Sequence, residues 1–417
     1  MSSTITTQPV NEPDPRSRPT PTAPASRTRS GSAAPRHLDA VDFVRMYMVA
    51  GVIAIHLVGY TTNPTDILAG GVGAILHLNR EVFFVLTAFV LTYGYGSRTG
   101  WSVWKFWKKR YLLIGVPYLV WTGIYFLADG SEHKPWVQVL HRLTTDLAQG
   151  LARYHLYFLL VTMQIYLLFP AMLWLLRKTK GHHGVLVAVA LAYQLAYTVL
   201  FHYRMHHPAV INVLFAHADP LITSYPLYMI GGGVAALHLD ELRTFVRTRP
   251  RAVGALVSAG FGVAVIAFLV DVYWVGQNAA QAGEVFQPSV IFSSAAAVLG
   301  LYTLGLRWAD KGEERRWRRS AAIAADTSFA VYLVHPLLIQ WLIALAAPVV
   351  TLGVDNKIPS AAVLPVDLFV VVPLLFILSA SAMRLVRYTP LSLPVTGRPR
   401  RERASAAVAK APAGAAA

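Results

Sequence analysis

The sequence predicts an all-α, polytopic membrane protein with about ten transmembrane helices. Hydrophobic residues make up 55% of its 417 positions and charged residues only 14%, and the mean hydropathy is +0.47. Apolar runs of about 20 or more residues recur from residue 40 to residue 387, separated by short polar connections. A helix of that length crosses about 30 Å of hydrocarbon, so the lipid bilayer is the expected surrounding of most of the chain.

One membrane domain over residues 38–390 contains all the predicted spans. Residues 1–37, rich in Ser, Thr, Pro and Arg, contain no apolar core typical of a secretory signal, and we expect a disordered cytoplasmic tail there. Residues 391–417 have a similar composition and lead to the same prediction. The spans cover residues 40–61, 68–97, 105–128, 151–176, 184–204, 218–238, 252–274, 288–308, 321–348 and 363–387.

Lys and Arg are concentrated in alternate connections between the spans. In a soluble protein the formal net charge of +16 would suggest a nucleic-acid partner, but here the basic residues follow the membrane topology, and no nucleic acid is expected. Because cytoplasmic loops hold an excess of Lys and Arg, this alternation predicts an even number of spans and two cytoplasmic termini. The basic connections are residues 27–36, 98–110, 177–180, 243–251, 311–319 and 384–417.

The first span contains two ionisable residues, Arg45 and His56. They are eleven positions apart, which places them within about 20° of one helix face and about 16 Å apart along it, so we expect them to line one groove. In the structural alternative, Arg45 extends to the inner membrane interface and pairs with Asp42, and His56 is a capped residue at the outer end of the span. The functional interpretation makes His56 a general base and Arg45 a group that binds an anion or stabilises developing negative charge.

The second span places Arg80 and Glu81 near the middle of the membrane, where ionisable side chains are costly. They either neutralise each other or take part in function, with Arg80 contacting substrate or Glu81 orienting a catalytic histidine. Arg110, at the basic start of the third span, is a topology signal or a ligand for the pyrophosphate of a cytosolic nucleotide. His155 and His335, the latter followed by Pro336, are each either structural or part of a substrate site.

Several kinds of chemistry lose support from the sequence. There is no cysteine, so thiolate metal sites and an acyl-enzyme on Cys are excluded. There is also no Walker lysine loop, no G-x-S-x-G elbow and no H-E-x-x-H pair. Three adjacent glycines, Gly231 to Gly233, are expected to allow close helix packing. The histidines at 202, 206, 207 and 217 are expected to lie at the surface, so neither a metal site nor a bound cofactor is predicted.

In these motifs the sequence resembles the acyltransferase-3 family of bacterial membrane proteins. Residues 41–45 (VDFVR) together with His56 are similar to the family's L-D-x-x-R start and R-x10-H motif. Residues 83–89 (FFVLTAF) resemble F-F-x-L-S-G-F, with Thr87 and Ala88 in place of Ser and Gly. Further similar segments are the basic start of the third span with Lys109, Arg110 and Pro117, residues 155–159 (HLYFL) and residues 332–336 (YLVHP).

The resemblance implies an enzyme that transfers an acyl group, acetyl or succinyl, from acyl-CoA as cosubstrate to a hydroxyl. The implied acceptor is a cell-envelope polysaccharide, a glycolipid or another glycosylated compound. Arg80 and Glu81 look like the branch that contains the succinyltransferase of a polyglucosamine exopolysaccharide. His56 and Arg45 would be catalytic, and Arg80, Glu81, Arg110, His155 and His335 would bind substrate.

Two other functions remain open at the level of sequence. A transporter or flippase of a lipid-linked or small polar solute would also carry Arg, Glu and His along a path through the membrane. It would move substrate without acyl-CoA and would release no CoA. A membrane glycosyltransferase is less favoured, because the first outer loop has only Asp66 and no paired acid for a metal-bound sugar phosphate.

Overall fold

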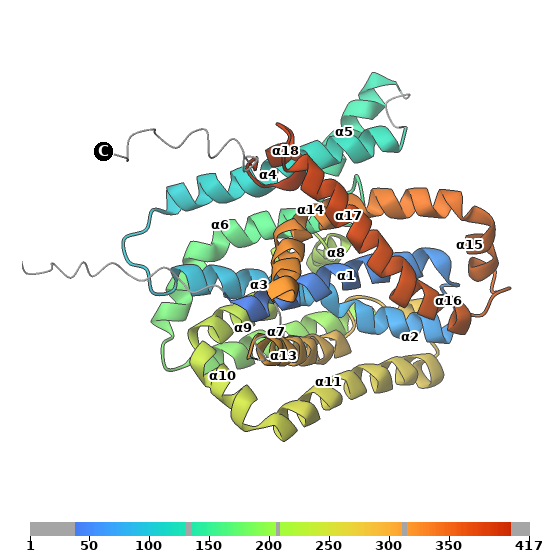
Figure 1. Cartoon of the computed structure of the whole chain (residues 1–417). Helices are drawn as coiled ribbons and strands as arrows, with labels where there is room; N and C mark the ends of the chain where they lie inside the picture. The colour runs from blue at the N-terminus through green and yellow to red at the C-terminus, as the bar shows by residue number, and fades with distance from the viewer. Residues whose placement is uncertain (1–37, 131–134, 206–208, 311–314, 402–417) are drawn as a thin grey trace, which may run out of the picture. The chain divides into compact units, whose positions relative to one another are not determined.

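The computed structural model describes residues 38–130, 135–205, 209–310 and 315–401, and within them it contains helices and no strand. Nine of the helical segments described are long and apolar enough to cross a membrane (Figure 1). The predicted fold class, an all-α polytopic membrane protein, is therefore confirmed. These segments are Asp39–Thr61, Ile67–Tyr95, Val103–Ala128, Tyr157–Lys178, His183–His202, Pro250–Val275, Ser289–Asp310, Ala322–Leu345 and Ser360–Val386.

The helices are labelled in chain order, and several spans are built from more than one helical segment. The long helices are α1 (Asp39–Thr61), α3 (Leu78–Tyr95), α4 (Val103–Ala128), α6 (Tyr157–Lys178), α7 (His183–His202), α11 (Pro250–Val270), α13 (Ser289–Asp310), α14 (Arg315–Leu345) and α17 (Val372–Val386). The shorter ones are α2 (Ile67–Leu76), α5 (Trp136–Gln149), α8 (Ala209–Ala216), α9 (Pro226–Leu237), α10 (Leu239–Thr248), α12 (Ala279–Ala282), α15 (Ala347–Val354), α16 (Ser360–Val366) and α18 (Ser392–Thr396). The π-helical turns η3 (Asp271–Val275) and η4 (Asp367–Val371) extend α11 and join α16 to α17.

The helix that carries Arg45 and His56 lies inside the bundle. Helix α1 packs against α3, α13, α14 and α17 (Figure 1). Its membrane-spanning window is 56% buried, against 17% for the Pro250–Val275 span. The side chains of α1 therefore face protein on most sides, whereas α11 presents much of its apolar surface outward, as a lipid-facing helix does.

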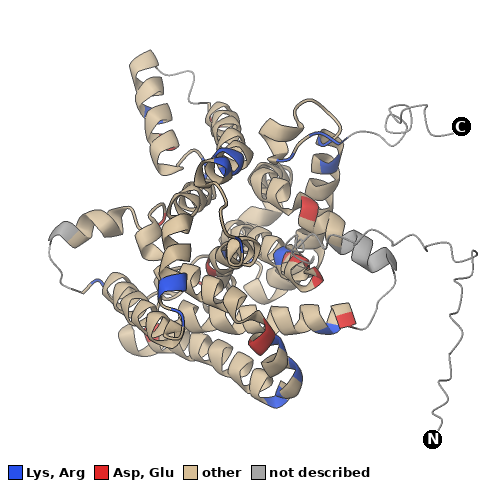
Figure 2. Ribbon diagram, turned by 90° about the vertical axis from the view of Figure 1, so that its left-hand side faces the viewer, with Lys and Arg blue, Asp and Glu red and all other residues tan. Residues whose placement is uncertain are grey.

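The basic connections at residues 98–110, 177–180 and 243–251 lie at one end of the bundle, which we call the basic end. Arg177 donates to the carbonyl oxygens of Gly96 and Arg98, and Arg247 pairs with Asp310 at 2.8 Å. These contacts join the ends of α3 and α6, and of α10 and α13. Figure 2 looks onto this end and shows Lys and Arg segments at several helix ends. The predicted alternation of basic connections thus corresponds to one face of the protein.

A second set of contacts closes the opposite end. The Thr61 hydroxyl donates to Asp367 at 2.5 Å, joining α1 to η4, and Arg153 donates to Gln340 at 2.6 Å. His202 at the end of α7 was expected at the surface, but it is buried and bonds Asp271 at 3.0 Å. The buried carboxylates of Asp367 and Asp271 therefore each have a partner from another helix, as the low dielectric of their surroundings requires.

The predicted span at residues 218–238 is wrong as a single helix. Only α9 is helical there over more than one turn, and its 12 residues extend about 18 Å, too short for a hydrocarbon core. Pro220 and Pro226 lack amide hydrogens, so a continuous helix would lose hydrogen bonds at both positions. The chain still returns to the basic end, since His238 after α9 lies 2.9 Å from His183 at the start of α7, Nε2 to Nδ1.

Side chains of α6 and α7 satisfy the non-helical backbone before α9. Gln164 donates to the carbonyl oxygen of Pro220 and accepts from the amide of Ile222. Gln194 and Tyr193 donate to the carbonyl oxygens of Ser224 and Thr223. Irregular backbone at membrane depth is tolerated only where protein or a polar cavity supplies such partners. This segment consequently has a fixed position, and it holds Asp219 against α3.

The membrane domain also ends later than predicted. Residues 391–401, expected to belong to a disordered tail, form α18 and a turn that packs on α4, α14 and α17. The hydrogen bond from the Trp121 indole to the carbonyl oxygen of Val395, 2.9 Å, supplies the tertiary contact that composition does not reveal. The predicted tails at 1–37 and 402–417 lie outside the described residues.

The orientation of the basic end can be tested by cysteine labelling, because the chain contains no native cysteine. Lys357→Cys lies between α15 and α16, and Lys180→Cys lies between α6 and α7. In right-side-out membrane vesicles we expect a membrane-impermeant maleimide to label position 357 at once and position 180 only after permeabilisation, since Lys-rich and Arg-rich loops are retained in the cytoplasm. The reverse pattern would contradict cytoplasmic termini.

Gly232 is the position at which α9 packs most tightly on α3. A Cβ there would collide with the carbonyl oxygen of Val85, whereas a Cβ at Gly231 meets nothing within 4 Å. We expect Gly232→Ala to destabilise the protein by about 1–3 kcal/mol through overpacking. The matched control, Gly231→Ala, should be neutral or stabilising by about 1 kcal/mol. Thermal unfolding in detergent measures both, and equal midpoints for the two variants would contradict this packing.

Candidate functional site

Three histidines from three parts of the chain meet near the end of the bundle opposite the basic end. His56 is on α1, His155 directly precedes α6, and His335 is on α14. The ring centroids of His56 and His335 are 5.6 Å apart, and those of His155 and His335 are 5.3 Å apart. The Tyr154 ring packs on His56 at 4.1 Å. The sequence identified each histidine separately, and the structure brings them together.

Pro336 fixes the orientation of His335. Helix α14 runs through Pro336, which has no amide hydrogen to donate to the carbonyl oxygen of Tyr332. His335 Nδ1 lies 2.7 Å from that oxygen and takes the place of the missing donor. Nδ1 must therefore carry a proton, and neutral His335 has its acceptor lone pair on Nε2. The His-Pro sequence thus sets the tautomer of a buried imidazole.

Several buried polar atoms around His56 have no hydrogen-bond partner among the described residues. They are the Tyr154 hydroxyl, both ring nitrogens of His155 and His335 Nε2. Leaving a buried polar group unpaired costs about 1–3 kcal/mol, so such a cluster is typical of a site that binds a polar ligand. Burial also raises the pKa of the Tyr154 hydroxyl well above its usual range, and this hydroxyl consequently remains a hydrogen-bond donor.

His56 opens into a cavity of about 490 Å³, which we call the outer cavity. The cavity lies between α1, α2, the start of α3, the turn before α6 and the segments around Asp219 and Gly283. Aromatic and polar side chains share its wall, as in sites for polar organic ligands. The lining includes His56, Tyr60, Asn63, His77, Asn79, Arg80, Tyr154, His155, Tyr157, Asp219 and Tyr332.

Arg80 joins the outer cavity to a buried ion-pair network. Its guanidinium donates to Glu81 Oε1 at 2.6 and 2.9 Å and to Asp219 Oδ1 at 2.8 Å. The ring of Phe286 lies 4.2 Å from the guanidinium carbon. Glu81 is 1% exposed, whereas the Asp219 side chain is 51% exposed. Glu81 therefore neutralises Arg80, and Asp219 and Arg80 line the cavity.

A second cavity, of about 230 Å³, lies toward the basic end, and we call it the inner cavity. Three arginines line it: Arg45 from α1, Arg110 from α4 and Arg398 from the turn after α18. Its other polar lining residues are Thr87, Thr162, Tyr166 and Ser328. Arg45 also bonds Asp42 at 3.2 Å. The chemistry of this wall suits an anion with several oxygen acceptors.

Three aromatic rings separate the two cavities. Phe83, Phe158 and Tyr332 line both of them. Their centroids are 5.5 Å apart for Phe83 and Phe158, 6.2 Å for Phe83 and Tyr332, and 5.3 Å for Phe158 and Tyr332. The Tyr332 hydroxyl donates to the carbonyl oxygen of His155 at 2.6 Å. We call these three residues the aromatic partition.

The structure changes two predictions about these residues. Arg45 and His56 do not line one groove, because the aromatic partition lies between the cavities they face. Glu81 contacts Arg80, and the described contacts of Glu81 include no bond to a histidine. Among the described residues no cluster of three or more His, Asp or Glu can hold a metal, and His206 and His207 of the histidine group lie outside them.

Sequence reasoning missed several residues that the structure places at the cavities, among them Tyr154, Asp219 and Arg398. Tyr154 precedes His155, a neighbour that was singled out, so the adjacent aromatic was a signal that could have been read. Asp219 lies beside Pro220 inside a segment predicted as helix, and no motif distinguishes it. Arg398 belongs to a segment whose composition resembles a disordered tail. Long-range packing alone brings the last two to their sites.

Comparison with known proteins identifies the chain. A model of the acyltransferase-3 family, described as an acyltransferase domain, matches residues 38–389, which include every helix from α1 to α17. No curated protein and no solved structure matches the chain. The match covers most of the sequence and contains the R-x10-H pair, both cavities except Gly397 and Arg398, and the aromatic partition. The chain therefore belongs to the acyltransferase-3 family of membrane acyltransferases.

Proposed function

We propose that this protein transfers an acyl group from acyl-CoA, bound at the inner cavity, to a hydroxyl of a glycosylated acceptor in the outer cavity. The proposal rests on one observation. Helix α1 lines both the basic inner cavity and the outer cavity that contains His56, and the aromatic partition forms the wall between them. A reaction between a cytosolic anionic donor and an acceptor at the opposite end needs two such sites in contact.

The donor site is the inner cavity. The phosphates of CoA are anions with several acceptor oxygens, and guanidinium forks bind such groups with charge-assisted hydrogen bonds. Arg45 and His56 are about 16 Å apart along α1, and the extended phosphopantetheine arm of CoA has a comparable length. With its phosphates at Arg45 and Arg110, the donor would bring its thioester to His56 by displacing rings of the aromatic partition, which are in contact with one another.

The reaction needs a base and a proton donor at the thioester. His56 takes the proton of the acceptor hydroxyl, and the oxygen attacks the thioester carbonyl carbon. The Tyr154 hydroxyl is the neighbouring donor for the resulting oxyanion. The carbon–sulfur bond then breaks, and the proton on His56 passes to the CoA thiolate. The products are an ester and CoA, and no oxidant, metal or covalent enzyme intermediate is required.

Of the two roles that the sequence offers Arg45, binding an anion or stabilising developing negative charge, we assign it the first. Its guanidinium lines the inner cavity and bonds Asp42, so it acts on the donor's phosphates and not on the oxyanion beside His56. In this assignment both residues of the R-x10-H motif take part in function, Arg45 at the inner cavity and His56 at the outer cavity.

The acceptor site is the outer cavity. Sugars are recognised by polar groups that bond their hydroxyls and by aromatic rings that cover their apolar faces. Arg80, Asp219 and Asn79 provide the former, and Tyr60 and Tyr154 the latter. The acceptor class is a polysaccharide of the cell envelope, a glycolipid or another glycosylated compound, and the acyl group is acetyl or succinyl. The protein lies in a cell membrane with its basic end facing the cytoplasm, so transfer occurs at the outer half of the bilayer.

His56→Ala should lower CoA release by about a hundredfold to ten-thousandfold, because the acceptor hydroxyl loses its general base. The measurement is CoA release from acetyl-CoA and from succinyl-CoA by purified protein in lipid nanodiscs, with and without a crude glycan acceptor. His141→Ala, at an exposed position on α5, is the matched control and should retain the wild-type rate.

Either of two results would contradict the assignment. CoA release at the wild-type rate by folded His56→Ala would show that His56 is not the general base. Absence of release by the wild type with either thioester, together with uptake of a polar solute without acyl-CoA, would favour the transporter.

Arg45→Ala should raise the KM for acyl-CoA about tenfold to a hundredfold, since it removes charge-assisted bonds of about 1.5–3 kcal/mol. The value of kcat should change much less than in His56→Ala. Initial rates over a range of donor concentrations separate the two effects. A loss confined to kcat would instead place Arg45 at the reacting atoms.

A further inference from the structure

The chain after α17 folds back onto the helix bundle. Helix α18 packs against α4, α14 and α17 (Figure 1). The indole of Trp121 donates to the carbonyl oxygen of Val395 at 2.9 Å, and the Ser392 hydroxyl donates to that of Arg398 at 2.8 Å. The amide of Arg401 donates to the carbonyl oxygen of Arg387 at 2.8 Å. These bonds define residues 388–401 as a docked segment, which we call the C-terminal clasp.

Gly397 determines where the clasp turns. It ends α18 with a φ of +65°, a left-handed conformation that favours glycine. A Cβ at this position would also lie 2.6 Å from both the carbonyl oxygen of Leu113 and the ring of Phe329. The backbone thus approaches α4 and α14 closely, and the next residue, Arg398, enters the wall of the inner cavity.

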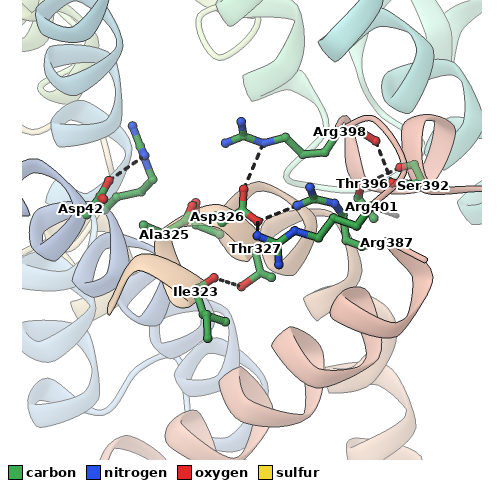
Figure 3. A network of polar contacts seen from close by, with 12 residues as sticks. Asp42, Ile323, Ala325, Asp326, Thr327, Arg387, Ser392, Thr396, Arg398 and Arg401 are labelled. Atoms are coloured by element: carbon green, nitrogen blue, oxygen red, sulfur yellow. Dashed lines mark hydrogen bonds and ion pairs between the residues drawn. The ribbon is translucent and has the colours of Figure 1, made fainter. Parts of the chain in front are cut away.

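Asp326 on α14 anchors the clasp. Its carboxylate pairs with Arg387 at 2.7 Å and lies 3.7 Å from Arg401 (Figure 3). Arg398 is held less tightly, since its Nε lies 3.9 Å from Asp326 Oδ1, beyond hydrogen-bonding distance. Figure 3 shows the forked end of Arg398 extending past the carboxylate, away from the clasp. The Arg398 side chain is 45% exposed.

The inner cavity consequently contains more positive than negative charge. Arg45, Arg110 and Arg398 line it from three elements that are far apart in the sequence. The carboxylates in contact with these arginines are Asp42, beside Arg45, and Asp326, which Arg398 shares with two other arginines. Arg110 Nε is buried and has no hydrogen-bond partner among the described residues. Guanidinium groups from separate elements around one cavity suit a phosphate, which accepts bonds from several directions.

Arg398 differs from a residue whose only role is to set topology, because it lines the inner cavity. Arg400, two positions further, donates to the carbonyl oxygen of Tyr388, is exposed and is not part of the cavity wall. A topology signal requires positive charge at the basic end and no particular direction. The turn at Gly397 places Arg398 in the wall of the inner cavity, where Arg400 does not lie.

We propose that Arg398, positioned by the C-terminal clasp, binds a phosphate of the acyl donor. The inference rests on the proposed function, because it takes the inner cavity as the place where acyl-CoA binds. It adds a residue outside the stretch that the family model matches, which ends at 389. A chain that ended before the clasp would keep His56 and its neighbours and lose donor affinity.

The test is a calorimetric titration of CoA, which has no acyl group and is not turned over, into the full chain in nanodiscs of uncharged lipid. Arg398→Ala should weaken CoA binding about tenfold or more, and Arg398→Lys should weaken it less, because a charge remains. Arg400→Ala is the matched control and should bind CoA as the wild type does. Thermal unfolding of each variant establishes that the clasp is intact, and Arg398→Lys serves if the alanine variant unfolds.

The outcomes separate this inference from the proposed function. Equal CoA affinity in the wild type and both folded Arg398 variants would overturn the role of the clasp and leave the acyltransferase reaction standing. No CoA binding by the wild type would overturn both. Headgroups of anionic lipids offer the same phosphate chemistry. Stabilisation by phosphatidylglycerol vesicles that requires Arg398, with CoA affinity unchanged, would assign the headgroup as ligand and overturn the inference.

Discussion

Inside a bilayer a polar group finds its partner within the protein, because hydrocarbon offers none, and this constraint shapes the structure. Arg80 is placed between Glu81 and Asp219, and the irregular backbone before α9 is bonded by Gln164, Gln194 and Tyr193. Against this background the unpaired atoms of Tyr154, His155 and His335 stand out, since they surround one residue, His56. Four unpaired polar atoms are thus gathered at the candidate site.

The arrangement along α1 explains how one helix can serve two ends of a membrane. Eleven residues return a side chain to nearly the same face and move it about 16 Å along the axis. Arg45 therefore faces the inner cavity, and His56 faces the outer one. The rings of Phe83, Phe158 and Tyr332 keep the cavities apart. A donor held by phosphate contacts at one end can present its thioester at the other, while the bulk of the partition excludes water.

The C-terminal clasp adds a residue from the end of the chain to the inner cavity. Three arginines from α1, α4 and the turn after α18 form one wall, so the proposed donor site is complete only when the C-terminal segment is docked. Asp326 links that docking to α14, the helix that carries His335 and Tyr332. Donor binding and the site around His56 are thereby connected through one continuous helix.

The sequence by itself determined the fold class, the alternation of basic connections and the residues Arg45, His56, Arg80, Arg110, His155 and His335, because hydropathy, charge and short motifs are local properties. It could predict from the His-Pro pair that the helix is altered at His335, but not that the spared carbonyl oxygen of Tyr332 would bind the imidazole. Tertiary structure alone decided that three histidines share a site, that Arg45 and His56 face different cavities, and that Asp219 and Arg398 reach them. The interruption of the predicted span at 218–238 also depended on side chains of α6 and α7 that donate hydrogen bonds to the non-helical backbone there. The physical reason is the same in each case: burial and hydrogen bonding join residues tens to hundreds of positions apart, and no local pattern records those partners.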